Sequence, residues 1–165
     1  MHWHDAVVEA FDEQNVEVVA FLPDSVLGPL IERLETESFD TVRVSREEAA
    51  IGVLAGAWLG GRRGALVCQT SGLANTFNAM GSFTEPWGIP FVGLVTHRGG
   101  LGEHNLAQIP AGYNMPMLLD ALGVRNQQLD PALDVKTQIS RATESAFATE
   151  DAFILLMDPK LGELT

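Results

Sequence analysis

The feature that most constrains the fold of this chain is a series of short runs that are almost entirely apolar. In chain order, six runs are expected to form strands, at residues 16–22, 42–44, 65–69, 90–96, 124–129 and 152–157; four of them have this character, whereas those at residues 42–44 and 124–129 contain polar residues. A strand that faces water on one side alternates apolar and polar residues, and the four apolar runs do not alternate. We therefore expect strands that are buried on both faces, as in a parallel sheet covered by helices on each side.

The segments between these runs carry apolar residues at helical spacing, and we expect helices at residues 4–14, 26–35, 49–57, 115–122 and 131–149. The chain has 165 residues, 46% of them hydrophobic, which suits one compact domain spanning residues 1–165. The alternation of strands and helices predicts a three-layer α/β/α domain of the flavodoxin-like type, with a mainly parallel sheet of about six strands.

A pair of carboxylates, Glu47 and Glu48, stands where the second run ends and an apolar helix begins. Ser45 followed three residues later by Glu48 fits a capping box, and acidic residues in a first helical turn stabilise it by about 0.3–1 kcal/mol. That interpretation accounts for Glu48 and leaves Glu47 unexplained. Because open α/β sheets bind ligands beyond the carboxyl ends of their strands, Glu47 is a candidate for function.

Small and polar residues follow several of the other runs, and parallel strands would bring them to the same edge of the sheet. They are Asp24 and Ser25 after the first run, Thr70, Ser71, Gly72 and Asn75 after the third, and His97 with Arg98 after the fourth. Asp24 and Ser25 are also suited to cap the helix expected from residue 26. An ordinary strand-to-helix turn capped by Ser71 explains residues 70–72 equally well.

The segment of residues 97–114 is long, rich in glycine and proline, and carries further polar residues, among them Glu103, His104 and Gln108. Connections longer than about 12–15 residues without regular structure usually serve binding or are mobile. We expect no regular structure in this segment and a role in binding for part of it.

The formal net charge of -12 argues against binding to nucleic acids or to anionic membranes, since phosphate contacts need clustered basic residues. The basic pair Arg62 and Arg63 falls in a predicted turn. Many acidic residues spread along a chain with only two lysines are typical of a surface adapted to high salt. So acidic a chain needs local positive charge to bind an anion, which makes His97 and Arg98 candidates for that role.

No apolar run approaches the roughly 20 residues that a membrane-spanning helix requires, and residues 1–5 do not resemble a signal peptide. We therefore expect a soluble, cytoplasmic protein. The single cysteine, Cys68, lies inside an apolar run. We expect it to be a buried, small hydrophobic side chain in preference to a reactive thiol.

The chain resembles a known family, the thiamine-diphosphate-dependent 2-keto-acid decarboxylases, in their pyrimidine-binding domain. There a glutamate opens a helix in the pattern Glu-x-x-Ala, followed six residues on by glycine; this chain has Glu47, Ala50 and Gly56. Residues 22–27, 70–75 and 97–99 support the match in the same order. The resemblance covers essentially the whole chain, and is greatest to the α subunits of sulfopyruvate decarboxylase and the N-terminal part of phosphonopyruvate decarboxylase.

The resemblance implies a lyase that removes CO2 from a 2-keto acid. The favoured substrate is 3-sulfopyruvate, which would give sulfoacetaldehyde, with phosphonopyruvate or another 2-keto acid as the alternative. Glu47 would be the catalytic residue and would hydrogen-bond the pyrimidine ring of thiamine diphosphate. The cofactor site would comprise Glu47, Thr70, Ser71, Gly72 and Asn75, and the substrate site Asp24, Ser25, His97, Arg98 and Gln108. For Arg98, an ion pair with Glu103 is the alternative interpretation.

The family binds the diphosphate through Mg²⁺ held by a Gly-Asp-Gly motif followed by asparagines, and this chain contains no Gly-Asp-Gly. The resemblance therefore implies a separate β subunit that binds the diphosphate and Mg²⁺, with the cofactor shared between the chains and no metal held by this one. Self-association within a hetero-oligomer is also expected. Alternatives are a regulatory module without catalysis, and a flavodoxin-like nucleotide binder, which the lack of a glycine repeat at residues 23–25 disfavours.

Overall fold

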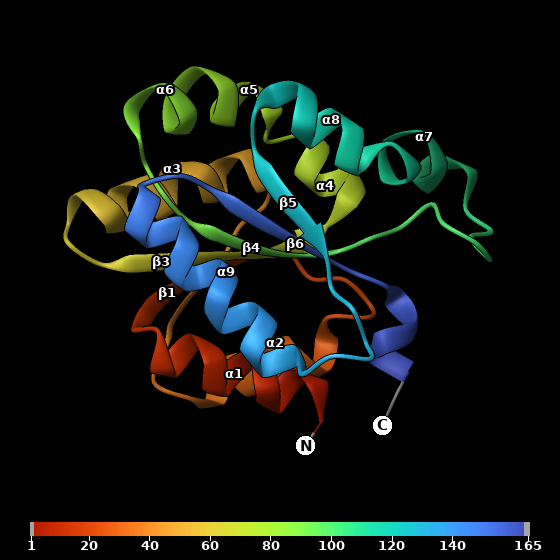
Figure 1. Ribbon diagram of the computed structural model, residues 1–165, viewed down its shortest axis with the longest axis horizontal. Coiled ribbons are helices and arrows are strands. Elements are labelled where there is room, and N and C mark those ends of the chain that lie inside the picture. Colours follow the sequence, from red (N-terminus) through yellow and green to blue (C-terminus); the bar gives the residue numbers. More distant parts are fainter. Residues whose placement is uncertain (1, 164–165) are drawn as a thin grey trace.

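The computed structural model describes residues 2–163. Over these residues the chain folds around one six-stranded sheet with the order β2-β1-β3-β4-β6-β5 (Figure 1). The strands are β1 (Val16–Phe21), β2 (Asp40–Arg43), β3 (Arg63–Gln69), β4 (Val92–Thr96), β5 (Arg125–Gln128) and β6 (Phe153–Met157). Neighbouring strands are parallel throughout, so the carboxyl ends of the strands lie at one edge.

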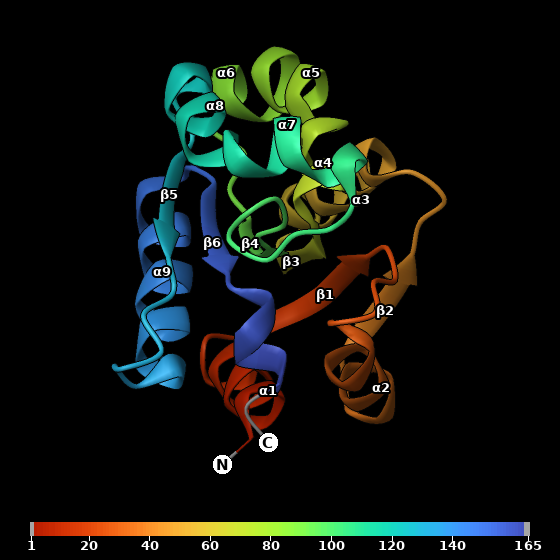
Figure 2. The same cartoon turned by 90° about the vertical axis from the view of Figure 1, so that its right-hand side faces the viewer.

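Helices cover both faces of this sheet (Figures 1 and 2). On one face lie α1 (Trp3–Glu13), α2 (Gly28–Thr36) and α9 (Val135–Thr149). On the other lie α3 (Glu47–Leu59), α4 (Thr70–Ala74), α5 (Phe77–Ala79), a π-helical turn at Met80–Thr84, α6 (Glu85–Trp87), α7 (Ile109–Tyr113) and α8 (Met115–Leu122). Short 3₁₀ turns occur at Leu106–Gln108 and Pro159–Glu163.

The hydrophobic core has two halves, one on each face of the sheet, and side chains from the apolar runs contribute to both. Along β3, Val67 packs with α1 and α2, while Leu66 and Cys68 face the opposite side, toward α3 and α8; none of these side chains is exposed. Because both faces of the central strands are covered, their sequences lack polar alternation. The predicted three-layer α/β fold with a parallel sheet is confirmed, as is the burial of Cys68.

The predicted helix caps are wrong. The N-cap of α3 is Arg46 and no side chain caps it, so Ser45 and Glu48 form no capping box. Glu48 is exposed and pairs with Arg46 at 3.2 Å. The N-cap of α4 is Gln69, whose side chain accepts a hydrogen bond from the Ser71 N–H, so Ser71 does not cap that helix.

Several predicted boundaries also differ from the structure. The helix expected from residue 26 begins at Gly28, because the Asp24 carboxylate accepts from the Val26 N–H at 2.8 Å and holds a separate turn. β3 begins at Arg63, which was expected in a turn; its guanidinium stacks on the Phe147 ring at 4.9 Å. α9 begins at Val135, where Asp134 caps it. Residues 97–114, expected to lack regular structure, contain a 3₁₀ turn and α7.

Within residues 2–163, the structure has no helix that combines the length and the apolar character needed to cross a membrane.

Candidate active site

The predicted site residues all lie along the carboxyl-terminal edge of the sheet, but in two groups. Glu47, Gly72 and Asn75 meet beyond β2 and β3. Asp24, Ser25, His97, Arg98 and Gln108 lie around the loops that follow β1 and β4. The connection from β4 to α7 runs across this edge (Figure 2).

Glu47 opens α3 and is only 5% exposed. Its side chain lies directly over Gly72, where an added Cβ atom would overlap Glu47 Oε1. Glu47 Oε2 accepts a hydrogen bond of 3.4 Å from the exposed Asn75 amide. The absence of a side chain at residue 72 is therefore what leaves room for this carboxylate. Among the described residues, Asn75 is the only hydrogen-bond partner of the Glu47 side chain.

The buried thiol of Cys68 lies close enough to two of the candidate carboxylates to be affected by them. Burial raises the pKa of the Cys68 thiol far above its usual range, and the carboxylates of Glu47 and Asp24 raise it further. Both carboxylates therefore act on the same buried end of β3. The thiol stays protonated and makes no nucleophile.

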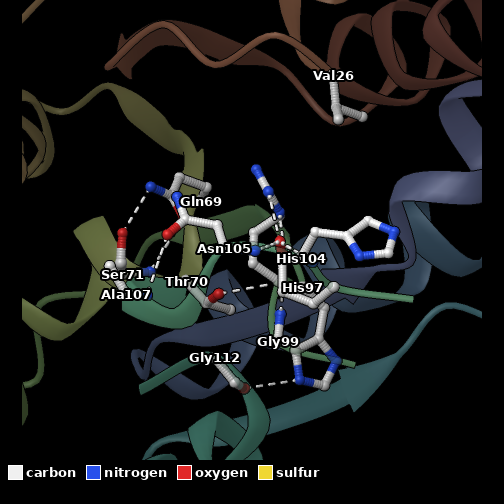
Figure 3. Close-up of polar contacts among 12 residues, drawn as sticks. Val26, Gln69, Thr70, Ser71, His97, Gly99, His104, Asn105, Ala107 and Gly112 are labelled. Carbon is white, nitrogen blue, oxygen red and sulfur yellow. Dashed lines mark hydrogen bonds and ion pairs between the residues drawn. The ribbon is translucent and has the colours of Figure 1, made fainter. Parts of the chain in front are cut away.

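Thr70 and Ser71 use their hydroxyl groups within the chain. Thr70 is fully buried, and its Oγ1 accepts from the Arg98 N–H at 3.1 Å, which ties the end of β3 to the end of β4 (Figure 3). Ser71 Oγ accepts from the Gln69 amide at 2.6 Å, and the Ser71 N–H donates back to Gln69 Oε1 at 3.2 Å (Figure 3). These contacts shape the turn above which the Glu47 carboxylate lies.

Arg98 is held between two carboxylates. Its Nε and Nη2 donate to the two oxygens of Glu103 at 2.8 and 3.1 Å, and its Nη1 lies 3.8 Å from Asp24 Oδ2. The ion pair with Glu103, considered from the sequence as the alternative for Arg98, is thus present. Because one positive group faces two negative ones, a substrate anion that approaches Arg98 must compete with the carboxylates of this chain.

Glu103 also organises the backbone around it. Its carboxylate accepts further hydrogen bonds from the N–H groups of Gly99, His104 and Asn105, at 3.3, 3.0 and 2.9 Å. The hydrogen bonds from Arg98 and then from Asn105 lower the pKa of Glu103 from 4.5 to about 2. The sequence does contain a signal for the pairing of Glu103 with Arg98. A glycine-rich loop can fold back on itself, so an acidic residue five positions after an arginine can reach the arginine side chain.

His97 connects the segment after β4 to Gly112 of α7 and to Gln128 of β5. Its Nε2 lies 2.9 Å from the Gly112 carbonyl oxygen (Figure 3). Its Nδ1 lies 2.8 Å from Gln128 Oε1. A carbonyl oxygen can only accept, so Nε2 carries a proton, while Nδ1 either donates to Gln128 or accepts from its amide. Gly112 packs so closely on Arg98 that a Cβ atom there would overlap the Arg98 carbonyl.

A cleft of about 1140 Å³ lies beside this segment. It is lined by Ser25, His97, Arg98, Gln128 and Lys160, together with the loop of residues 99–106. The sequence did not predict Gln128 and Lys160 as site residues, because only the pairing of β5 with β6 and the turn after β6 bring them to the cleft. Gln108, predicted to bind substrate, does not line the cleft; its Oε1 is buried and without a hydrogen-bond partner among the described residues.

The described part of the chain contains no group of three or more histidine, cysteine, aspartate or glutamate residues that could hold a metal ion. The residues around Glu47 offer a single acidic side chain with an amide beside it. This donor set suits a hydrogen-bonding ring nitrogen and does not suit Mg²⁺, which prefers several oxygen ligands in octahedral geometry.

No model of a known protein family matches the chain. The α subunit of sulfopyruvate decarboxylase from Methanococcus maripaludis is 33% identical over 159 residues, which are 96% of this chain and 95% of that one. A sulfopyruvate decarboxylase from Methanosarcina acetivorans is 28% identical over 159 residues, which are 41% of its longer chain. A phosphonopyruvate decarboxylase from Streptomyces viridochromogenes is 42% identical over 95 residues, 57% of this chain and 24% of that one.

A solved structure has the same fold. The 2-oxoglutarate:ferredoxin oxidoreductase from Magnetococcus marinus, determined with 2-oxoglutarate, coenzyme A and succinyl-CoA bound, superposes with a TM-score of 0.75 at 17% identity. The match covers 98% of this chain and 29% of that one. At this identity, the likeness shows that the fold is shared.

Proposed function

Since the chain belongs to the family of sulfopyruvate decarboxylase α subunits, we propose that it is the pyrimidine-binding half of a thiamine-diphosphate-dependent 2-keto-acid decarboxylase. It is a subunit of a carbon–carbon lyase, and its favoured substrate is 3-sulfopyruvate, converted to sulfoacetaldehyde and CO2. A phosphonopyruvate or other 2-keto-acid decarboxylase subunit is the alternative, because a phosphonopyruvate decarboxylase is also among its relatives.

The observation that carries the proposal is the poorly satisfied carboxylate of Glu47. It is 5% exposed, lies over a glycine that makes room for it, and accepts one long hydrogen bond, from Asn75, among the described residues. A buried carboxyl group without strong partners is free to hydrogen-bond a ligand and to share a proton with it. The site therefore fits the N1′ atom of an aminopyrimidine ring, held between Glu47 and Asn75.

The roles of this chain's own residues follow from that placement. When bound, thiamine diphosphate supplies the electron sink that decarboxylation requires. Glu47 would hold a proton between its carboxylate and N1′ of the pyrimidine, in a position shielded from water. Asn75 would orient the carboxylate through the amide hydrogen bond that it already makes. Gly72, which has no side chain, would leave room for the Glu47 carboxylate and for the edge of the pyrimidine ring.

Substrate binding is proposed for the cleft beside the β4–α7 connection. The two acidic groups of 3-sulfopyruvate are anions, and the cationic side chains that line the cleft are Arg98 and Lys160, with His97 fixed between Gly112 and Gln128. Ser25 lines the cleft, and Asp24, whose carboxylate lies 3.8 Å from Arg98 Nη1, precedes it; both would contact the keto acid. Arg98 would act with its Nη1 edge, because Glu103 occupies Nε and Nη2.

A partner chain is needed for the rest of the cofactor. The described residues supply no cluster of metal ligands, so the diphosphate and Mg²⁺ are proposed to bind to a β subunit. The Methanosarcina acetivorans relative supports this division, because the segment similar to this chain occupies 41% of a longer chain that carries no subunit name. In the present protein, the remaining part would be a separate polypeptide within a hetero-oligomer.

Reconstitution tests the proposal. The chain would be mixed with the purified product of a reading frame from the same genome that carries the Gly-Asp-Gly motif, with thiamine diphosphate and Mg²⁺. We expect CO2 release that depends on both chains and on the cofactor, with a higher kcat/KM for 3-sulfopyruvate than for phosphonopyruvate or pyruvate. A stable complex that releases no CO2 from any of the three acids would contradict the proposal.

A further inference from the structure

The cleft beside the β4–α7 connection carries as many negative as positive side chains. Apart from its two histidines, the charged residues that line it are Arg98, Glu103, Asp158 and Lys160. Asp24 adds a further carboxylate, whose Oδ2 lies 3.8 Å from Arg98 Nη1. A site that attracts anions by its overall field has an excess of positive charge. This cleft must therefore hold an anion through individual contacts.

Arg98 has little of its hydrogen-bonding capacity left for a substrate. Glu103 accepts from its Nε and Nη2 at 2.8 and 3.1 Å, in the bidentate geometry that an anionic ligand would otherwise use. Nη1 remains, and there the Asp24 carboxylate is already near. Asp24 is held in place, since its Oδ1 accepts from the Val26 N–H at 2.8 Å and only 8% of its side chain is exposed. An anion bound at Nη1 therefore lies beside a fixed carboxylate.

The other carboxylates of the cleft are also fixed. Hydrogen bonds from Arg98 and then from the Asn105 N–H lower the pKa of Glu103 from 4.5 to about 2, so Glu103 is an anion at neutral pH. Asp158 Oδ1 accepts from the Lys160 N–H at 2.9 Å, which keeps a carboxylate close to the base of the Lys160 side chain. Each cation of the cleft thus has a carboxylate of the same chain next to it.

The two candidate keto acids differ in the charge of their second acidic group. A sulfonate keeps a single negative charge at all working pH values, because sulfonic acids are strong. A phosphonate loses its second proton near neutral pH, as a phosphate monoester does. The cost of removing an ion from water rises steeply with its charge, and each carboxylate nearby adds repulsion. A cleft whose cations are already matched cannot offset this cost for a second charge.

We propose that Asp24 and Glu103 determine specificity by repulsion: they admit a keto acid whose second acidic group is a monoanion and reject one in which that group is a dianion. This inference rests on the proposed function, because it concerns the cleft proposed for the keto acid. It deepens that function by giving a physical reason for a preference for 3-sulfopyruvate over phosphonopyruvate. Placing like charge against a competitor is one of the two ways in which a protein discriminates between ligands.

Two probes that lack the keto group measure this selectivity without any reaction. They are 3-sulfopropionate and 3-phosphonopropionate, which otherwise match the two keto acids. The full chain alone serves, since its own residues line the cleft, and NMR titration gives the Kd of each probe at about pH 6 and about pH 9, on either side of the second phosphonate ionisation. The ratio of Kd for the phosphonate to Kd for the sulfonate should rise about tenfold between them, the effect expected for one added charge near a carboxylate at a protein surface.

Variants that remove one charge each test the two residues. Asp24→Asn keeps the shape of the side chain and its acceptor for the Val26 N–H, and it should limit the rise in the ratio to about threefold. Glu103→Gln should have a similar effect, with circular dichroism to verify the fold. Glu37→Gln is the matched control, because it also removes a carboxylate paired with an arginine, Arg33, but at the C-terminal end of α2, away from the cleft. It should keep the full rise.

The outcomes separate this inference from the proposed function. A change of charge on His97 or His104, which also line the cleft, acts on both probes, and the control variant would show it. A wild-type ratio that is the same at both pH values, or that rises equally in all the variants, would overturn the inference, as would a chain that binds neither probe. A chain that shows the expected selectivity, but whose reconstituted complex releases no CO2 from 3-sulfopyruvate, would contradict the proposed function alone.

Discussion

Glu47 and Glu103 lie at the same edge of the sheet. Glu47 is buried, with 5% of the residue exposed, and Glu103 is partly buried, with 9% of its side chain exposed. Their partners differ greatly. Glu103 accepts two hydrogen bonds from Arg98 and three from backbone N–H groups. Glu47 accepts one, at 3.4 Å, from Asn75 in the described structure.

The difference teaches how to separate structural from functional carboxylates. A buried carboxylate must recover the hydration that it loses, through hydrogen bonds or an opposite charge. Glu103 recovers it inside the chain, and its role is to hold the loop around Arg98. Glu47 accepts only the one long hydrogen bond in the described structure, and we therefore assign it to a ligand that the isolated chain does not supply.

Among substitutions that leave Glu47 in place, Gly72→Ala should have the largest effect, because it displaces the carboxylate without removing it. The new Cβ atom would overlap Glu47 Oε1 and force the side chain away from its position. A displacement near 1 Å can cost on the order of 100-fold in rate, so kcat of the reconstituted enzyme should fall by about that factor. Gly28→Ala, where a Cβ atom meets nothing within 4 Å, is the control. A loss below about threefold for Gly72→Ala would show that the contact with Gly72 is unimportant.

Glu103→Gln tests the other side of the comparison. The folded-state pKa of Glu103 is lowered from 4.5 to about 2, so its contribution to stability is present above pH 4.5 and is lost as the pH falls toward 2. The variant should melt several degrees lower at pH 7 and lose less stability than the wild type between pH 4.5 and 2. Melting temperatures measured for both proteins between pH 2 and pH 7 would detect these two differences. Glu37→Gln, which removes an exposed ion pair with Arg33, should melt as the wild type does.

Glu85 sharpens the comparison, because it is a half-buried carboxyl group far from the proposed ligand site. Burial and the neighbouring Asp151 raise its pKa from 4.5 to about 7, and its Oε1 has no hydrogen-bond partner in the described structure. The folded state thus keeps a proton that the unfolded state loses, and the free energy of unfolding should fall as the pH rises from 4.5 to 7. Glu85→Gln should remove this slope and be more stable at pH 8 by about 1 kcal/mol, allowing for solvent screening.

Urea unfolding of Glu85→Gln and the wild type at pH 5 and pH 8 measures this effect. Parallel pH profiles for the two proteins would show that Glu85 does not hold a proton near neutral pH.

Glu48→Gln should have the smallest effect, although Glu48 is adjacent to Glu47 in the sequence. Glu48 is exposed and makes one surface ion pair, with Arg46 at 3.2 Å. Such pairs contribute less than about 1 kcal/mol, so urea unfolding should give a free energy within about 0.5 kcal/mol of the wild type. A larger loss would restore the capping role that the sequence predicted and the structure does not show.

The fold could be predicted because its evidence is local. Apolar runs without polar alternation indicate strands buried on both faces, and this pattern survives even when helix caps are misassigned. Glu47 could be selected for the same reason, since its position at a strand-to-helix junction needs no tertiary information. The cap predictions failed because the N-cap positions of α3 and α4 are taken by Arg46 and Gln69, both with extended backbone, and not by Ser45 and Ser71.

The contacts that complete the site depend on residues far apart in the sequence. His97 meets Gln128 across 31 positions, and Thr70 meets the backbone of Arg98 across 28. Such pairs follow from the strand order, which the sequence pattern does not specify. Arg98 with Glu103 is an intermediate case, because only five residues separate them and their opposite charges allowed the pairing to be considered.

The central claim is that Glu47 activates a cofactor that another chain helps to bind. The most direct test is the single-turnover rate of CO2 release by the reconstituted enzyme with Glu47→Gln, which keeps the size of the side chain and removes its acid. We expect a rate at least about 100-fold below wild type, with unchanged circular dichroism and unchanged affinity for the partner subunit. A rate within threefold of the wild type would contradict the account.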